Sequence, residues 1–334
     1  MDFALTEEQE LLRTTARNLL SRECPITLVR AHIDDRGAAD GLWGHLRQWT
    51  ELAQGPLTDL CLFLEEMGAV LAPGKFFPTV GLLAPVLEAA GHDLLPAVLA
   101  GELTGTVAMA GPDGGWTPGP DPIKTFVPEA DRVDVVAVVG GEPLLPTLTV
   151  ARGLPVTPQP TVDSTRRLAQ VDTSAAPGPA TDLDPDVVAN VLERAHVAVA
   201  AELLGTTRWL FDAALAYAKV RRQFGRPIGS FQAIQHKLAN MALARERAWS
   251  AVYYAAMTLD AGDPDRHRAA HVAKAAAGEA AKLNAKDAIQ IHGGVGYTWE
   301  HDLHLFIKRA YASEHFMGTS GWHHERLGDL LIRS

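Results

Sequence analysis

The second half of the chain is the feature that most constrains its fold. From about Asp186 to the C-terminus the residues are almost all helix-forming, with abundant alanine and with breaks at 225–229, 261–265 and 293–298. Pieces of this length and amphipathic pattern predict helices that pack closely against one another. We therefore expect a C-terminal helical bundle over residues 186–334.

The first hundred residues predict a separate helical domain, residues 1–103. Thr6 lies three residues before Gln9 in a capping box, the pattern that begins a helix. Leucine and alanine then recur at helical spacing through Leu20. Further apolar-periodic stretches, separated by glycine or proline, follow at residues 41–53, 57–71, 80–90 and 94–100.

The residue composition changes between these two helical regions. Residues 104–173 contain many prolines and glycines and short β-rich runs, which predict a small middle domain of short strands. A segment rich in proline, alanine, serine and aspartate, residues 174–185, is expected to be a linker. The predicted fold is mainly α with a small central β domain. The β-rich runs are residues 106–110, 124–127, 133–139 and 148–150.

Composition excludes several classes of partner. The 40 acidic residues outnumber the 30 basic ones, giving a net charge of −10, so clustered cations for nucleic acid are missing. The two cysteines cannot build a disulfide framework and fit a reducing compartment. The charged N-terminus is no signal peptide, and no apolar stretch reaches the roughly 18–20 residues of a membrane span. We expect a cytoplasmic protein.

One segment, residues 217–241, could hold a phosphate. Arg221 leaves the end of a helical face just before a glycine- and proline-rich turn, and Ser230 is a plausible N-cap for the next helix. An arginine beside a new helix N-terminus offers donors that suit a pyrophosphate. The alternative is that Arg221 only neutralises the dipole at the end of its own helix.

Two further segments are candidates for a dinucleotide-binding turn and for a metal site. Gly293, Gly294 and Gly296 permit close approach to the backbone, but their spacing and context do not fit a Rossmann motif. His301 and His304 lie three apart, with further histidines downstream, yet no established metal-binding pattern appears. The sequence predicts no metal site, and a histidine-bound metal enzyme remains a separate alternative. The downstream histidines are His315, His323 and His324.

The motifs RRQFGRPIGSFQAIQHKLANM and AIQIHGGVGYTWEHDLHLFIKRA resemble the C-terminal domain of the acyl-CoA dehydrogenases. FALTEEQELLRTTARNLL and DSTRRLAQVD resemble earlier parts of the same family. The chain is most similar to the short subunits of actinobacterial heteromeric dehydrogenases that degrade steroid side chains. This resemblance implies an N-terminal helical domain, a reduced β-barrel-like middle domain and a C-terminal four-helix bundle.

The resemblance also implies the cofactor FAD, bound across a dimer interface, and an acyl-CoA substrate. Family members remove an α-proton from the acyl-CoA, and the β-hydrogen passes to the flavin as hydride. The match places Arg221 on the FAD pyrophosphate of a partner chain, with Gln223 and Phe224 beside it. The other positions matched to cofactor contacts are Phe231, Gln232, Gln290, Ile291, His292, Gly293, Gly294 and Thr319.

The catalytic base of the family has no clear counterpart. Many members have a Tyr-Glu-Gly-Thr stretch where this chain has Met317, whose thioether cannot accept a proton. Other members use a residue that falls here on Ala195, with Glu193 two residues earlier. Two residues are about 200° around a helix, so Glu193 is better explained as a first-turn glutamate on the helix dipole. Glu314, one turn before Met317, is the remaining candidate for the base, but we expect it on a surface face.

The middle domain also lacks two family motifs that hold the flavin ring and the thioester. This combination predicts an FAD-dependent acyl-CoA dehydrogenase subunit that forms a trans-2-enoyl-CoA within a heterotetramer, where a longer partner supplies the base. The alternative is a non-catalytic structural or regulatory subunit of such a complex. By family analogy, an electron-transfer flavoprotein is the expected electron acceptor and lipid or steroid breakdown the expected setting.

Overall fold

The computed structural model describes residues 3–176, 178 and 180–333. The chain divides into two compact units, each built from separate stretches of sequence. The first unit takes residues up to Ile26, Cys61–Ala72 and the chain from His196 onward. The second unit takes Thr27–Leu60 and Pro73–Ala195.

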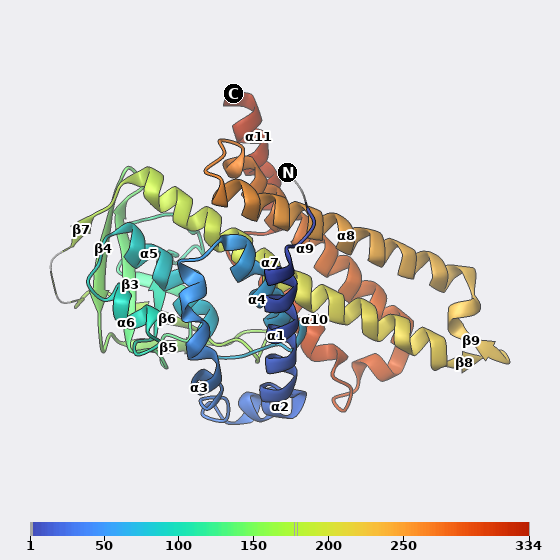
Figure 1. The fold of residues 1–334 in the computed structure, drawn as a ribbon. Coiled ribbons are helices and arrows are strands. Elements are labelled where there is room, and N and C mark those ends of the chain that lie inside the picture. The colour runs from blue at the N-terminus through green and yellow to red at the C-terminus, as the bar shows by residue number, and fades with distance from the viewer. Residues whose placement is uncertain (1–2, 177, 179, 334) are drawn as a thin grey trace. The chain divides into compact units, whose positions relative to one another are not determined.

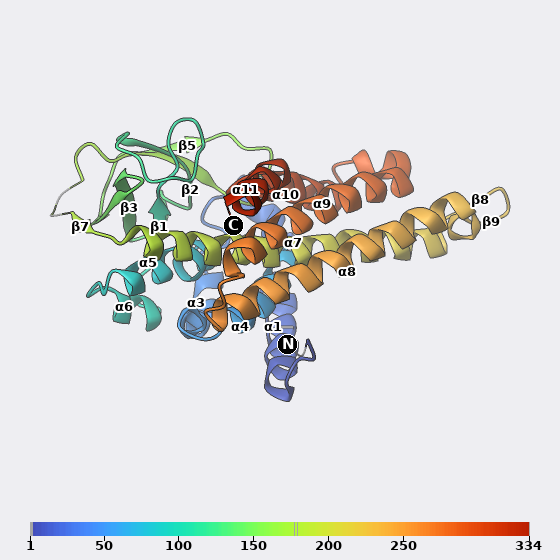
Figure 2. The same cartoon turned by 90° about the horizontal axis from the view of Figure 1, so that it is seen from above.

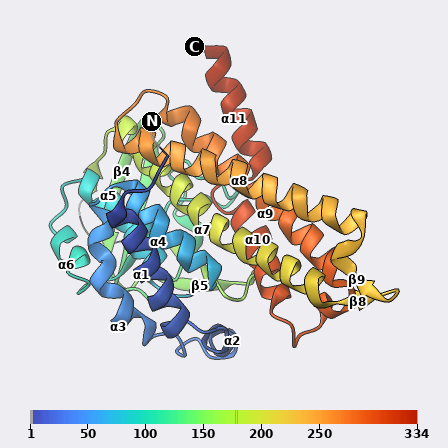
Figure 3. The same cartoon turned by 45° about the vertical axis from the view of Figure 1, so that its right-hand side comes forward.

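Long helices dominate the first unit. Helices α8 and α9 run antiparallel along each other, beside the later part of α7, and the β8–β9 hairpin forms their far tip (Figures 2 and 3). The predicted capping box is confirmed, since Thr6 and Gln9 each accept a hydrogen bond from the other's backbone N–H at 3.2 Å. The helices are α1 (Glu7–Glu23), α4 (Leu57–Ala69), α7 (Pro185–Val220), α8 (Gln232–Asp260), α9 (Arg266–His292), α10 (Leu303–His315) and α11 (Ser320–Arg333).

The three predicted breaks in the C-terminal helices are confirmed. The first forms the hairpin of β8 (Arg222–Gln223) and β9 (Arg226–Pro227), followed by the short 3₁₀-helix η3 (Ile228–Ser230). The third forms the 3₁₀-helix η4 (Gly293–Tyr297). The prediction that Ser230 caps α8 is wrong. Its hydroxyl donates to the carbonyl of Pro227 at 2.7 Å, and Phe231 occupies the cap position.

Helices α4 and α7 cross at two glycines within the first unit. A Cβ atom added to Gly205 would lie 1.8 Å from the carbonyl oxygen of Glu65, and one added to Gly68 would lie 1.9 Å from that of Glu202. Only residues without a side chain permit backbones to approach this closely. Near the crossing, the buried guanidinium of Arg309 donates to Glu202 at 2.9 Å.

The second unit contains short helices and two sheets (Figure 1). The helical segments are α2 (Ile26–Asp34), α3 (Leu42–Leu46), η1 (Arg47–Ala53), the π-helix η2 (Phe77–Leu83), α5 (Ala84–Ala89) and α6 (Leu95–Leu99). The strands are β1 (Gly105–Ala108), β2 (Ile123–Pro128), β3 (Val135–Glu142), β4 (Leu145–Ala151), β5 (Val156–Gln159), β6 (Leu168–Asp172) and β7 (Thr181–Asp182).

One sheet has the order β1-β3-β4-β7, with β1 parallel to β3 and the other pairs antiparallel. The other is antiparallel with the order β2-β6-β5. Buried residues from both sheets, among them Ala108, Val127 and Val138, form the core of this region. The four β-rich runs seen in the sequence correspond to β1–β4. The sequence missed β5, which carries Pro158, β6, and the two-residue β7.

No helix in the described part of the chain combines the length and apolarity needed to cross a membrane.

Candidate functional site

The segment expected to reach a cofactor forms a strained, exposed tip. Strands β8 and β9 pair so that Phe224 and Gly225 make the two-residue loop, with φ angles of 50° and 78°. Positive φ at both loop residues is the geometry of a tight hairpin turn, and it is costly for a bulky residue such as phenylalanine. The ring of Phe224 is nevertheless 92% exposed. Such strain on an exposed aromatic residue points to a contact outside this chain.

Arg221 lies at the base of this hairpin, directly after α7 ends. Its backbone N–H donates to Tyr217 at 2.8 Å and its carbonyl accepts from Ile228 at 2.8 Å, so its main chain is fixed. The residue is exposed, and no described residue pairs with its guanidinium. Arg226 differs, because its guanidinium lies 4.2 Å from the ring centroid of Phe231. A fixed backbone with a free guanidinium suits an anionic ligand.

The glycine-rich segment meets the same end of the helices. His292, the last residue of α9, stacks on Tyr217 of α7 with 4.5 Å between ring centroids. The following Gly293 has φ of 63°, and a Cβ atom added to Gly293 or Gly294 would have no other atom within 4 Å. Gln290 is exposed one turn earlier. The structure thus brings Arg221 and the 290–294 segment to one end of the long helices.

These residues fit the diphosphate and adenosine part of FAD. They provide a free guanidinium, an exposed amide and open backbone at two glycines, which are groups that recognise an anion and tolerate close approach. Gln223 and Gln232 are exposed on either side of the turn, and Phe231 is half-buried between them. Ile291 is buried, so its contribution is limited to its backbone.

Thr319 does not join this group. It lies between α10 and α11, where Lys274 near the start of α9 donates to the carbonyl of the neighbouring Gly318 at 2.9 Å. From Lys274 to His292 the helix rises about 27 Å. The hydroxyl of Thr319 accepts a hydrogen bond from the backbone of Trp322 at 3.2 Å, as part of the start of α11.

Met317 also lies at this second end of α9. Its side chain is 1% exposed and its φ is 61°, a conformation that few residues of its kind adopt. The carbonyl of Met317 faces the ring of His323 at 3.1 Å. A buried thioether therefore occupies the position where the resemblance places a carboxylate.

The prediction that Glu314 belongs to a surface face is wrong, because its side chain is buried. The backbone N–H and hydroxyl of Ser320 donate to its Oε1 at 2.9 and 2.7 Å, and Lys282 donates at 2.9 Å. Burial alone would raise its pKa, but these hydrogen bonds lower it to about 2. Glu314 holds the start of α11 in place and is a poor proton acceptor at neutral pH.

The interpretation of Glu193 as a first-turn glutamate is also wrong. Helix α7 begins at Pro185, so Glu193 lies in its third turn, and the residue is 6% exposed. The helix begins one residue before the predicted start at Asp186, with Pro185 well suited to its first position, so a first-turn placement of Glu193 was inconsistent with that start. Its role as a base stays a prediction.

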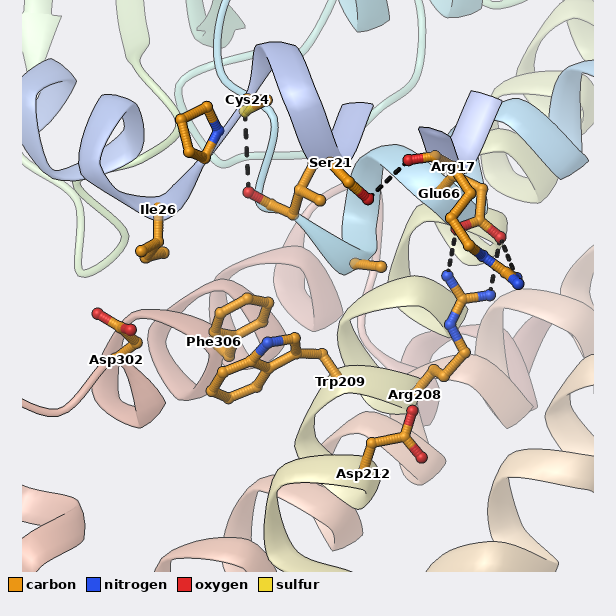
Figure 4. A pocket seen from close by; sticks show the side chains of 13 residues that line it. Arg17, Ser21, Cys24, Ile26, Glu66, Arg208, Trp209, Asp212, Asp302 and Phe306 are labelled. Carbon is orange, nitrogen blue, oxygen red and sulfur yellow. Dashed lines mark hydrogen bonds and ion pairs between the residues drawn. The ribbon is translucent and has the colours of Figure 1, made fainter. Parts of the chain in front are cut away.

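The largest cavity described in the first unit, about 450 Å³, lies elsewhere. One wall is an ion-pair network in which Arg17 and Arg208 both donate to Glu66, and another is the stacked pair of Trp209 and Phe306, 3.5 Å between centroids (Figure 4). Burial opposes ionisation of Glu66, but the two arginines lower its pKa. No residue that the sequence proposed for the site lines this cavity.

Sequence reasoning missed one cluster. His196, His271 and His323, on α7, α9 and α11, each bring a ring nitrogen to within 4.8 Å of the others. The nearest two are 52 residues apart along the chain, so no local motif connects them. His301 and His304, which the sequence singled out, instead take part in hydrogen bonds with the backbone of Leu303 and Trp299.

Residues 186–331 match the family model described as acyl-CoA dehydrogenase, C-terminal domain. The chain is 33% identical to the acyl-CoA dehydrogenase IpdE2 of Mycolicibacterium smegmatis over 94% of this chain and 96% of that one.

Two solved structures are similar throughout. A variant of the Tcur3481-Tcur3483 steroid ACAD is 27% identical, with a TM-score of 0.88 over 98% of each chain. The ChsE4-ChsE5 complex of Mycobacterium tuberculosis is 21% identical, with a TM-score of 0.87 over the whole of both chains, and shows the shared fold.

Proposed function

Because the chain belongs to the acyl-CoA dehydrogenase family of oxidoreductases, we propose that it is the cofactor-completing subunit of a heteromeric acyl-CoA dehydrogenase. In this assembly a longer partner chain supplies the catalytic base and the pocket for the flavin ring. This chain supplies Arg221, Gln223, Phe224, Gln232 and the 290–294 segment to the FAD held largely by that partner.

The observation that carries the proposal is the contrast between the two groups of site residues. Arg221, Gln223, Phe224, Gln232 and Gln290 are exposed, and no described residue forms an ion pair with Arg221. At the position of the base, Met317 is buried and nearby Glu314 is held ionised by Ser320 and Lys282. A general base needs a free acceptor whose pKa lies near the working pH, and neither residue meets that condition.

Within the proposed site, each group of this chain binds or positions a different part of the cofactor. The guanidinium of Arg221 binds the diphosphate as a charged hydrogen-bond donor. Gly293 and Gly294 allow the cofactor to approach the backbone, and the rigid hairpin positions the ring of Phe224 against it. FAD, when bound, supplies the acceptor for the β-hydrogen of the acyl-CoA. Removal of the α-proton falls to the partner.

Two relatives support a heteromeric assembly. The Tcur3481-Tcur3483 protein is described as a steroid ACAD, and the ChsE4-ChsE5 structure as a complex. By analogy with these proteins, we propose that this chain also works beside a second, different chain and on a bulky acyl-CoA such as a steroid-derived one. An electron-transfer flavoprotein is the proposed electron acceptor.

The first experiment counts flavins. The chain is purified alone and with a longer acyl-CoA dehydrogenase subunit encoded beside it, and bound flavin is measured per chain from the absorbance of the released cofactor. We expect little flavin on the lone chain and fewer flavins than chains in the complex. Full flavin occupancy with turnover by the lone chain would overturn the proposal.

The second experiment replaces the proposed diphosphate ligand. In the complex, Arg221→Ala is expected to weaken flavin binding by about 10- to 100-fold, the usual loss for one charged hydrogen-bond donor. Lys219→Ala is the matched control, because it removes the same charge from an exposed position about 200° around α7. Isothermal titration of FAD into the stripped complexes measures both.

The alternative is a structural subunit that never contacts cofactor, which the absence of a recognisable base also fits. That alternative predicts the same flavin affinity for Arg221→Ala, Lys219→Ala and the unaltered complex. Equal affinities would therefore replace the proposal with a non-catalytic, stabilising role.

A further inference from the structure

Three histidines that the proposed function does not use converge at the second end of α9. His196 comes from α7, His271 from the first turns of α9 and His323 from α11. Their ring centroids lie 4.8 to 5.6 Å apart, and the ring planes are inclined to one another by 40° to 90°. The rings therefore surround a common point instead of stacking, which is how imidazoles surround a metal ion.

The hydrogen bond of His323 determines which of its nitrogens is available. Its Nε2 faces the carbonyl oxygen of Met317 at 3.1 Å, and only a protonated nitrogen donates to a carbonyl. The lone pair of neutral His323 is then on Nδ1, which points at Nδ1 of His271 at 2.8 Å. Metal-bound histidines are typically oriented in this way, by donation from the other nitrogen to a backbone carbonyl.

His196 provides the second, independent observation. The residue is 5% exposed, and neither of its ring nitrogens has a hydrogen-bond partner among the described residues. A buried imidazole left without partners is costly, by about 1–3 kcal/mol for each unsatisfied group. A ligand at the centre of the cluster would give its lone pair a partner.

All three rings are uncharged at neutral pH. Burial lowers the pKa of His196 well below its usual value, and lowers the pKa values of His271 and His323 to about 4 and about 2. In the metal-free state the Nδ1–H of His271 donates to Nδ1 of His323, so His271 moves this proton to Nε2 when its Nδ1 binds a metal. Charged groups near the cluster include Arg326, which faces His271, and Lys274, which faces His196 and His323. The Nζ of Lys274 donates to the carbonyls of Glu314 and Gly318 at 2.9 Å each.

We propose that His196, His271 and His323 form a site for one divalent transition-metal ion of the Zn²⁺ type, linking α7, α9 and α11. Zn²⁺ binds three histidines at about 2.0–2.1 Å, with water or another ligand in the fourth position. Tetrahedral geometry separates ligand nitrogens by about 3.3 Å. The two Nδ1 atoms, 2.8 Å apart, need to move apart by roughly half an ångström, and a nitrogen as far as 4.8 Å from the others needs to move closer by about 1.5 Å. The ion ties together the helices beside Met317.

The test uses the full-length protein, stripped with a chelator and reloaded with Zn²⁺ or Co²⁺. We expect about one bound ion per chain by elemental analysis, the intense visible bands of tetrahedral Co²⁺, and a higher Tm with Zn²⁺. His271→Ala should weaken Zn²⁺ binding by more than about 100-fold, beyond the effect of losing an outer hydrogen bond. His271 is less buried than His196 and His323, so this variant is the one most expected to fold.

His324→Ala is the matched control, because it removes an exposed imidazole next to His323 on the same helix. It should leave metal affinity and the Co²⁺ spectrum unchanged. Equal Zn²⁺ binding by the unaltered chain and His271→Ala would overturn the proposal, as would binding that His324→Ala abolishes. Absence of any Zn²⁺ binding or Tm shift in the unaltered chain would overturn it without recourse to variants.

Discussion

The two ends of α9 differ in almost every physical respect. At the C-terminal end, Gln290, Gly293 and Gly294 are open beside the exposed Arg221 and the hairpin tip. At the N-terminal end, Met317, Glu314 and His323 are buried and hydrogen-bonded within the chain. We call the end of α9 at residues 290–294 the open end, because its groups are accessible to a ligand. We call the end near Met317 and Glu314 the filled end, because side chains of this chain occupy it.

The strongest test of this contrast introduces a carboxylate at the filled end. Met317→Glu buries an ionisable group without a prepared partner, so we expect the free energy of unfolding to fall by about 3 kcal/mol or more. Met317→Leu, which keeps an apolar side chain of similar volume, should cost less than about 1.5 kcal/mol. Urea denaturation measures both. A stable Met317→Glu chain that dehydrogenates acyl-CoA alone would break the contrast.

A weaker effect at the same end comes from Glu314. Its pKa is lowered to about 2, so its ionised form stabilises the fold above about pH 4.5, and this contribution disappears as the pH falls toward 2. Glu314→Gln should reduce stability at neutral pH by about 1–2 kcal/mol and flatten the stability profile between pH 4.5 and 2.

The control for that profile is Glu325→Gln, at an exposed position on α11. Thermal unfolding across the pH range compares the two variants. If Glu325→Gln flattens the acid limb as much as Glu314→Gln does, the acid sensitivity comes from general surface charge and not from the filled end.

Adding a single methyl group at Gly294 tests whether the open end contacts the cofactor. Gly294→Ala meets no atom of this chain, so stability should change by less than about 1 kcal/mol. In the complex, the same methyl group obstructs the cofactor, and we expect flavin affinity to fall about tenfold, which is about 1.4 kcal/mol. Gly328→Ala, at an equally open position on α11, should leave flavin affinity unchanged. Equal affinities in both variants would place the cofactor elsewhere.

Local patterns predicted much of the fold. The long helices were predictable from their hydrophobic periodicity, because a 3.6-residue repeat can be recognised without knowing which surface the helix packs against. The breaks between them were visible because glycine and proline interrupt helices at defined positions. Strands β5 and β7 were missed, since β5 contains Pro158 and β7 has only two residues that pair with β4.

The candidate site was predictable only in part. The stripe that ends at Arg221 and the glycines after α9 marked the open end correctly, because each feature lies within one short segment. The burial of Glu314 and the cluster of His196, His271 and His323 were not predictable, since both depend on helices far apart in the sequence. Glu314 is buried because Ser320 and Lys282 come to it from other segments.

The crossing of α4 and α7 carries a consequence for the evolution of such chains. With carbonyl oxygens 1.8 and 1.9 Å from where Cβ atoms would stand, even an alanine at Gly68 or Gly205 would push the two backbones apart by more than an ångström. The ion pair between Glu202 and Arg309 would move with them. In descendants of this chain, a mutation at either glycine would therefore need a second one to restore the spacing.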